Sequence, residues 1–187
     1  MGRALRADAE RSVRAILEAA ERVLAADAGA SMERIAEAAG VTRITVHRRF
    51  ANRQALLEAL GVSAKQALIE AIEEARPGSA PALVALYRVT ANVLRVKKAW
   101  RFTLSHATPH SPAAAELWAE IDAHTVDLLV RAQREGILAP ATDLDWTRQV
   151  YYALLDEALD KPGTDQDPDT LAALVIDTVL HGGGPHS

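Results

Sequence analysis

The sequence predicts an all-α protein of about nine helices, and three features of its 187 residues support this fold class. Apolar residues recur at intervals of three and four, which places them on one face of a helix. Aromatic residues make up 4% of the chain and alanines number 38, which favours helices over a sheet of branched and aromatic side chains. Hydrophobic residues at 49% and charged residues at 25% give the balance of a folded globular protein.

The first predicted helix covers about residues 7–26, where the apolar residues follow the helical spacing. Its apolar face consists of Val13, Ile16, Leu17, Ala20, Val23 and Leu24. Residues 27–29 end this helix because they contain a glycine in a polar turn. Ser31 then fits the N-cap position of a second, short helix over residues 32–39.

A third short helix follows a tight turn. Gly40 supplies the turn, and Thr42 can cap a helix that carries Val46 and Phe50 on its buried side. Two short helices joined by the sequence Ala-Gly-Val-Thr are typical of a helix-turn-helix.

The rest of the chain predicts six helices separated by segments that contain proline or glycine. They cover about residues 54–75, 82–98, 100–106, 113–135, 144–160 and 168–181. Gly61 lies inside the first of these, where it either allows a bend or permits close packing. Gly136 stands where a left-handed helix cap is expected. The last residues, GGGPHS, are predicted to be disordered.

Several classes of protein are excluded by residues that the chain lacks. Without cysteine there is no disulfide, thiolate nucleophile or Cys-ligated zinc, which fits a reducing cytoplasm. The N-terminal segment carries charges throughout and no apolar run is long enough to cross a bilayer, so we expect a cytoplasmic protein with no membrane partner. Because the motifs of nucleophile elbows, phosphate loops and zinc proteases are missing, we expect neither an enzyme nor a cofactor.

Charge is distributed unevenly along the chain. Residues 1–53 contain ten Lys or Arg against seven Asp or Glu, whereas residues 54–187 contain eleven against eighteen. A basic N-terminal part on an acidic remainder indicates that only the N-terminal part contacts a polyanion. The sequence therefore predicts two domains, a polyanion-binding domain over residues 1–53 and a helical domain over residues 54–187.

The third predicted helix has the side chains of a DNA-reading helix. A helix fits the major groove and reads bases from residues near its N-terminal end. At about 100° per residue, the group opposite the buried face can contact bases: Arg48 a guanine, Thr45 a base or phosphate, Ile44 a thymine methyl group. The predicted set also includes Arg43, His47, Arg49, Arg53, Ser31 and Thr42. Arg3 and Arg6 also suit phosphates if the tail ahead of the first helix lies along DNA. The alternative is that these arginines only form a solvated face.

The segment from Arg11 to Leu56 resembles the N-terminal domain of the TetR family of bacterial repressors. The residues in register with the family pattern are Gly40, Val41, Thr42, Thr45, Val46 and Phe50. The resemblance implies a repressor that binds a palindromic double-stranded DNA operator as a homodimer and is released by a small organic effector. Two positions depart from the pattern: His47 replaces a usual Tyr, and Arg53 a usual Lys whose phosphate contact it should preserve. A helical adaptor that binds only protein is the alternative function.

The resemblance also implies that the last two helices form the dimer interface. The predicted interface residues are Trp146, Val150, Leu154, Leu171, Leu174, Val175 and Thr178, which recur at helical spacing. One apolar stripe on each helix would serve an intramolecular core equally well.

The middle helices are implied to hold the effector. The predicted effector-binding residues are Tyr87, Trp100, Phe102, Leu104, His106, Leu117, Trp118, His124 and Tyr151. The alternative is that Trp100 and Trp118 simply fill the core. His106 and His110 are spaced four apart, but Pro109 interrupts the helix between them, so no metal site is predicted.

Overall fold

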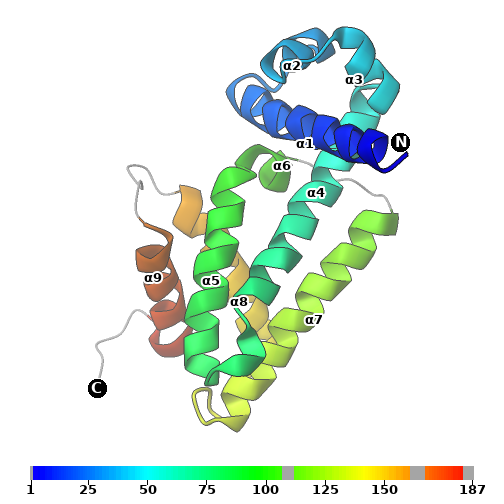
Figure 1. The fold of residues 1–187 in the computed structure, drawn as a ribbon. Helices are drawn as coiled ribbons and strands as arrows, with labels where there is room; N and C mark the ends of the chain where they lie inside the picture. The colour runs from blue at the N-terminus through cyan, green and yellow to red at the C-terminus, as the bar shows by residue number, and fades with distance from the viewer. Residues whose placement is uncertain (1, 107–111, 161–166, 183–187) are drawn as a thin grey trace. The chain divides into compact units, whose positions relative to one another are not determined.

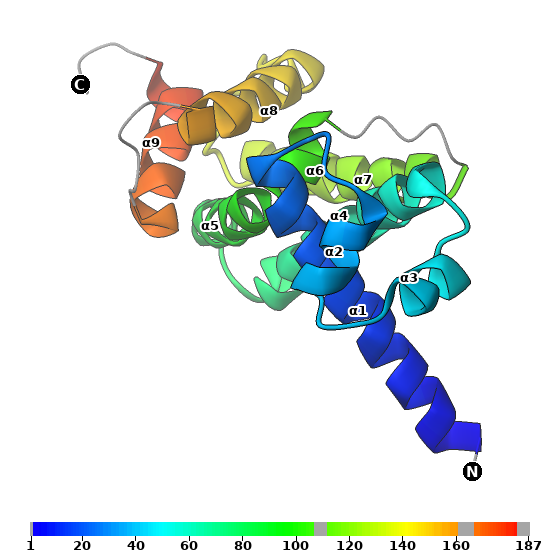
Figure 2. The same cartoon turned by 90° about the horizontal axis from the view of Figure 1, so that it is seen from above.

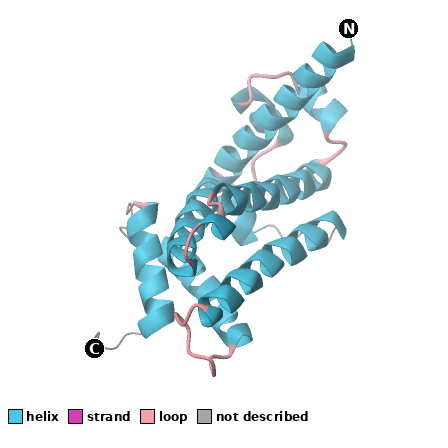
Figure 3. Ribbon diagram, turned by 60° about the horizontal axis from the view of Figure 1, so that its bottom comes forward, coloured by secondary structure: helices cyan, strands magenta, loops and turns pink. Residues whose placement is uncertain are grey.

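The computed structural model describes residues 2–106, 112–160 and 167–182, which form nine α-helices and one short 3-10 helix (Figure 1). The helices are α1 (Gly2–Ala26), α2 (Met32–Ala38), α3 (Arg43–Arg49), α4 (Arg53–Glu74), η1 (Pro77–Ser79), α5 (Ala82–Ala99), α6 (Arg101–His106), α7 (Pro112–Arg134), α8 (Leu144–Asp160) and α9 (Pro168–His181). The described residues contain only helices and loops (Figure 3), which confirms the all-α fold class.

The chain divides into two compact units. The first contains the described residues of 1–64 and 100–114, and the second those of 65–99 and 115–187. Helix α4 begins in the first unit and continues into the second without a break. The division into domains after residue 53 stays a prediction: it falls at the first residue of α4, whereas the first compact unit reaches residue 64 and includes residues 100–114.

The core of the first unit lies between α1, α2, α3 and the beginning of α4. Helix α2 packs against α1, α3 packs against α2, and α6 packs against α1 (Figure 2). The fully buried side chains at its centre are Ile16, Leu24, Ile35, Val46, Leu56 and Leu60. Trp100 and Phe102 are partly buried against the same core, so residues far along the chain complete the N-terminal helices.

Local capping contacts confirm the predicted helix starts. Ser31 Oγ accepts a hydrogen bond from the Arg34 amide at 3.2 Å, and Thr42 Oγ1 accepts one from the Thr45 amide at 3.2 Å. Gly40 adopts a φ of 66°, which a side chain would disfavour, and so turns the chain between α2 and α3. Gly136 likewise has a φ of 75° at the end of α7, as its position predicted.

The start of α1 corrects one expectation. Arg3 and Arg6 were expected in a tail ahead of a helix beginning at about residue 7, but α1 already begins at Gly2. The charged residues of this segment are good helix formers, so the helix extends forward beyond its apolar stripe. The side chains of Arg3 and Arg6 lie outside the described part of the structure.

The second unit packs α5, α8 and α9 together, with α9 lying beside α5 and α8 (Figures 1 and 2). Arg131 on α7 donates to the carbonyl oxygens of Pro77 and Ala80 at 2.6 and 2.9 Å. Glu135 accepts from the Ala82 amide at 2.6 Å. These contacts fix the connection between α4 and α5 on the end of α7. Within the described ranges, no helix is long and apolar enough to cross a membrane.

Candidate nucleic-acid interface and ligand cavity

Helix α3 is anchored from behind by two apolar residues and open on its other side. Val46 is fully buried and Phe50 is 6% exposed, whereas Ile44 is 79% exposed. Arg43, His47 and Arg48 are exposed as well, while Thr45 and Arg49 are half-buried. The side chains predicted to face a ligand thus lie on the open side of a helix held rigidly to the first unit.

The N-terminal end of α3 carries two linked hydroxyl groups. Thr42 Oγ1 and Thr45 Oγ1 lie 2.9 Å apart and share a hydrogen bond, while Thr42 also caps the helix. The Thr45 hydroxyl is therefore held against Thr42 at the start of the helix.

An ion pair connects α3 with α2. Arg43 Nε lies 2.8 Å from Glu33 Oε1, and both side chains are largely exposed. The pKa of the Glu33 carboxyl is lowered by a hydrogen bond from its own backbone amide, by the Ser31 hydroxyl and by the charge of Arg43. Ser31 therefore acts on this face in two ways, as the cap of α2 and as a partner of Glu33.

Arg53 has a structural contact that the sequence did not predict. Its Nη1 and Nη2 atoms donate to the carbonyl oxygens of Ala30 and Ala28, each at 2.5 Å. The guanidinium therefore fastens the loop between α1 and α2 to the start of α4. Contact between Arg53 and a phosphate stays a prediction.

A buried carboxylate ties α1 to α6. Glu21 is 5% exposed, and its carboxylate accepts hydrogen bonds from the Phe102 amide at 2.7 Å and the Thr103 amide at 3.2 Å. The Thr103 hydroxyl donates to it as well. Sequence reasoning missed this residue, although its place between Leu17 and Leu24 on the apolar face of the helix was a signal of burial.

The second unit contains a cavity of about 250 Å³. Its lining is Leu68, Ile72, Val89, Val93, Lys97, Trp118, Ile121, Thr125, Tyr151, Tyr152, Leu155 and Asp156. Two of the predicted effector-binding residues, Trp118 and Tyr151, lie in this lining. His124 and Tyr151 line a second space of about 20 Å³, which is large enough only for water.

The other predicted effector-binding residues are placed elsewhere. Trp100 and Phe102 are partly buried against the core of the first unit and are absent from the lining of the cavity of about 250 Å³, so their contact with an effector stays a prediction. The Tyr87 hydroxyl donates to Asp177 at 2.6 Å, and this bond raises the pKa of Tyr87 to about 12. Leu104 and Leu117 are half-buried and line neither cavity. The side chain of His106 and the whole of His110 lie outside the described residues.

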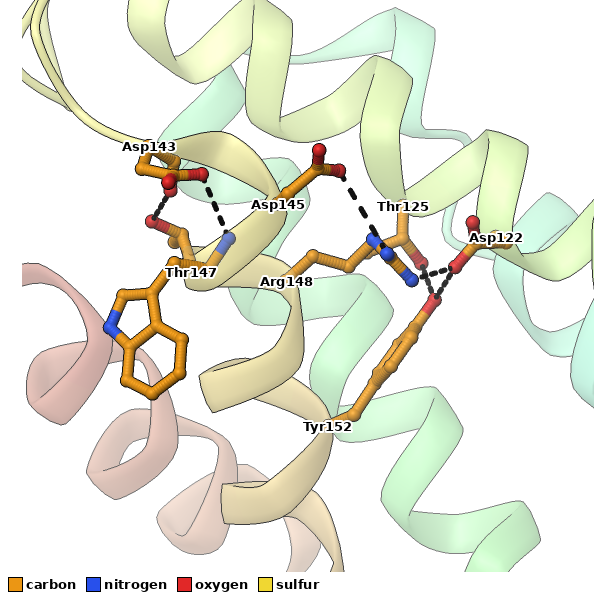
Figure 4. Close-up of polar contacts among 8 residues, drawn as sticks. Asp122, Thr125, Asp143, Asp145, Thr147, Arg148 and Tyr152 are labelled. Carbon is orange, nitrogen blue, oxygen red and sulfur yellow. Dashed lines mark hydrogen bonds and ion pairs between the residues drawn. The ribbon is translucent and has the colours of Figure 1, made fainter.

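Figure 4 shows polar contacts between α7 and α8, and two of the residues involved, Thr125 and Tyr152, also line the cavity. The Tyr152 hydroxyl lies 3.1 Å from both Asp122 Oδ1 and Thr125 Oγ1, and Arg148 Nη1 donates to Asp122 Oδ1 at 2.5 Å. Burial raises the pKa of Tyr152. The sequence analysis did not select Tyr152, although it adjoins Tyr151 on the same helix.

The predicted dimer residues divide between two faces. Trp146 is 64% and Leu174 51% exposed, and Val150, Leu154 and Thr178 are half-buried. Leu171 and Val175, each 2% exposed, belong instead to the core within the chain. Their inclusion in the interface is therefore corrected: the stripe on α9 that carries them faces the other helices of the second unit.

Replacing His47 by tyrosine tests the departure noted at that position. The side chain is exposed on α3. We expect His47→Tyr to keep or raise the affinity for a DNA site, because the tyrosine hydroxyl can bond a phosphate. Fluorescence anisotropy at neutral pH measures the affinity, and a loss of about tenfold or more would reject the expectation.

The sequence is similar to those of known regulatory proteins. Residues 16–60 match the family model described as bacterial regulatory proteins, tetR family. The HTH-type transcriptional repressor LfrR of Mycolicibacterium smegmatis is 39% identical over 146 residues, which cover 78% of this chain and 76% of that protein.

Solved structures extend the likeness to the whole fold. The structure of LfrR from Mycobacterium smegmatis in complex with proflavine matches with a TM-score of 0.70 and 29% identity, covering 95% of this chain and 99% of that one. The TetR family regulator PfmR from Thermus thermophilus matches with a TM-score of 0.76 at 19% identity, covering 91% of this chain and 99% of that one.

Proposed function

The chain belongs to the TetR family of bacterial regulatory proteins, and on this premise we propose that it is a repressor that binds a palindromic operator as a homodimer and is released by a small organic effector. Residues 1–53 form the DNA-binding domain in this proposal, and residues 54–187 form the effector-binding and dimerisation domain. The similar protein LfrR is a transcriptional repressor, which supports repression rather than activation of the controlled genes.

One observation carries the proposal: α3 presents its charged side outward while Val46 and Phe50 hold it from behind. A helix held in this way enters the major groove as a rigid body and loses little entropy on binding. Arg48 can pair with a guanine through two hydrogen bonds, and Ile44 can contact a thymine methyl group. Arg43, His47 and Arg49 flank them and suit phosphates.

The dimer is needed for operator geometry. Two recognition helices about 34–36 Å apart can enter successive major grooves on one face of the duplex. The exposed apolar side chains of Trp146 and Leu174, on the last two helices, support a twofold contact through α8 and α9.

Replacing Leu174 by glutamate is expected to convert the dimer to a monomer. Leu174 is 51% exposed in the single chain, and a twofold interface would bury two copies of the introduced carboxylate. We expect the dimer dissociation constant to rise by about 100-fold or more. Light scattering after size-exclusion chromatography measures the mass, with Leu83→Glu on α5, 37% exposed, as the control. A Leu174→Glu protein that stays as dimeric as the control would contradict this interface.

Induction is a shift between two conformations in this proposal. The effector occupies the cavity of about 250 Å³ and favours the conformation whose recognition helices no longer fit the operator. Coupling of about 1–3 kcal/mol between the sites is sufficient for a regulator. Helix α4 is the proposed lever because it runs through both units and contributes Leu68 and Ile72 to the cavity. The proflavine complex of the similar LfrR supports an effector of small organic type.

The proposed function is tested by selecting genomic DNA fragments on the full-length protein and measuring their affinity against salt. We expect a palindromic fragment to be bound. A plot of the logarithm of its association constant against the logarithm of the salt concentration should fall with a slope of roughly 0.9 for each phosphate contacted. A helical adaptor would select no sequence and show no such slope. Failure to enrich any palindromic fragment would overturn the proposal.

A further inference from the structure

The large cavity carries an inference about the chemistry of its ligand, which rests on the proposed function only in treating this cavity as the effector site. Six aliphatic side chains from α4, α5, α7 and α8 surround most of it: Leu68, Ile72, Val89, Val93, Ile121 and Leu155. An apolar cavity of about 150 Å³ already holds a benzene molecule, so about 250 Å³ accommodates a larger apolar body.

Two of the lining residues, Lys97 and Asp156, are charged, and their side chains differ in solvent exposure. Lys97 Nζ lies 2.6 Å from Asp156 Oδ1, but the Lys97 side chain is 17% exposed and that of Asp156 is 68% exposed. The Lys97 side chain is therefore the more buried member of the pair, whereas the Asp156 carboxylate stands largely in solvent. Asp156 can turn into water at little cost, but Lys97 needs an anionic partner wherever water is displaced.

The hydroxyl groups of the lining already have partners within the protein. The Tyr151 hydroxyl shares a hydrogen bond with Thr90 at 3.0 Å, and the Tyr152 hydroxyl is bonded to Asp122 and Thr125. Asp122 in turn receives Arg148. None of these carboxylates or hydroxyls is left to neutralise a ligand cation without breaking an existing bond.

A second lysine, Lys65, lies close to the Trp118 ring. Lys65 is 5% exposed, and its Nζ lies 5.4 Å from the centre of the Trp118 ring, which lines the cavity. A cationic ligand stacked on Trp118 would share the ring with this ammonium group and be repelled by it.

We propose that the effector is an amphipathic carboxylic acid, with its apolar body among the aliphatic side chains and its carboxylate replacing Asp156 as the partner of Lys97. When such a ligand displaces water from the cavity, the Lys97 ammonium group keeps a carboxylate partner. Neither the ammonium group nor the ligand carboxylate is then buried without an opposite charge.

Calorimetric titration of the full-length protein with octanoate, octanol and octylammonium tests this proposal, since the three probes share one chain and differ in charge. We expect octanoate to bind about tenfold or more tightly than either other probe. Lys97→Met should remove this preference, Lys97→Arg should retain it, and Asp156→Asn should strengthen octanoate binding by removing the competitor. The neighbouring exposed Lys98→Met is the control and should leave the preference intact.

Several results would overturn the inference: octylammonium bound as tightly as octanoate, an octanoate preference unchanged in Lys97→Met while Lys97→Met stays folded, or no binding of any probe at millimolar concentration. Operator binding by the ligand-free protein is measured in parallel. A protein that binds its operator but prefers the cation contradicts only the charge of the effector, whereas one that binds octanoate but no DNA contradicts the proposed function.

Discussion

Replacing Arg48 by alanine is expected to lower operator affinity by one to two orders of magnitude and to relax base preference at one position of each half-site. The side chain is exposed on α3, opposite the anchors Val46 and Phe50. A bidentate arginine–guanine contact discriminates against other bases by about 1–3 kcal/mol, and a dimer makes the contact twice.

Affinity measurements on a set of operators mutated at each position separate this effect from a loss of charge. Arg48→Lys keeps the positive charge without the planar fork, so it should recover part of the affinity but little of the base preference. Arg88→Ala, on the exposed surface of α5, is the matched control and should change neither. A loss in Arg48→Ala that is equal for all sequences would assign Arg48 to phosphate contact instead.

Replacing Glu21 by alanine is expected to destabilise the protein by about 3 kcal/mol or more. The buried carboxylate accepts from the amides of Phe102 and Thr103 and from the Thr103 hydroxyl. Removing it leaves three donors without their acceptor, and each buried donor left unpaired costs about 1–3 kcal/mol. Glu21→Gln should cost less, because one side-chain oxygen remains to accept.

Urea unfolding followed by circular dichroism measures this effect. Glu18→Ala removes an exposed carboxylate from the same helix and serves as the control, for which we expect a change within about 0.5 kcal/mol. If Glu21→Ala and Glu18→Ala unfold at the same urea concentration, the contact between α1 and α6 contributes nothing to stability.

Features that depend on a few neighbouring residues could be predicted from the sequence. The caps at Ser31 and Thr42 and the left-handed turns at Gly40 and Gly136 follow from side chains that bond or free the adjacent backbone. The burial of Val46 follows in the same way from helical spacing, whereas Phe50 is buried as the C-cap residue of α3, where the backbone is already extended.

Features that depend on contacts across the chain could not be predicted in this way. Helical spacing showed that Leu171 and Val175 share a face but not whether that face meets α5 or a second copy, and the structure buries them within the chain. Trp100 suited a ligand pocket by composition, yet it packs on a core built by residues that precede it by some forty positions or more. A phosphate contact was predicted for Arg53 from its charge, whereas in the structure its guanidinium donates to two backbone carbonyl groups more than twenty residues away in the sequence.

The most direct test of the central claim, that the open face of α3 meets the bases of DNA, is photocrosslinking from a benzophenone-bearing residue at position 44. Ile44 is 79% exposed there, so the substitution leaves the anchors of α3 in place. We predict crosslinks to bases in each half of the operator, whereas the same group at position 146 on α8 should crosslink a second copy of the chain and not DNA. Position 44 giving no crosslink to an operator that the protein still binds would contradict the account.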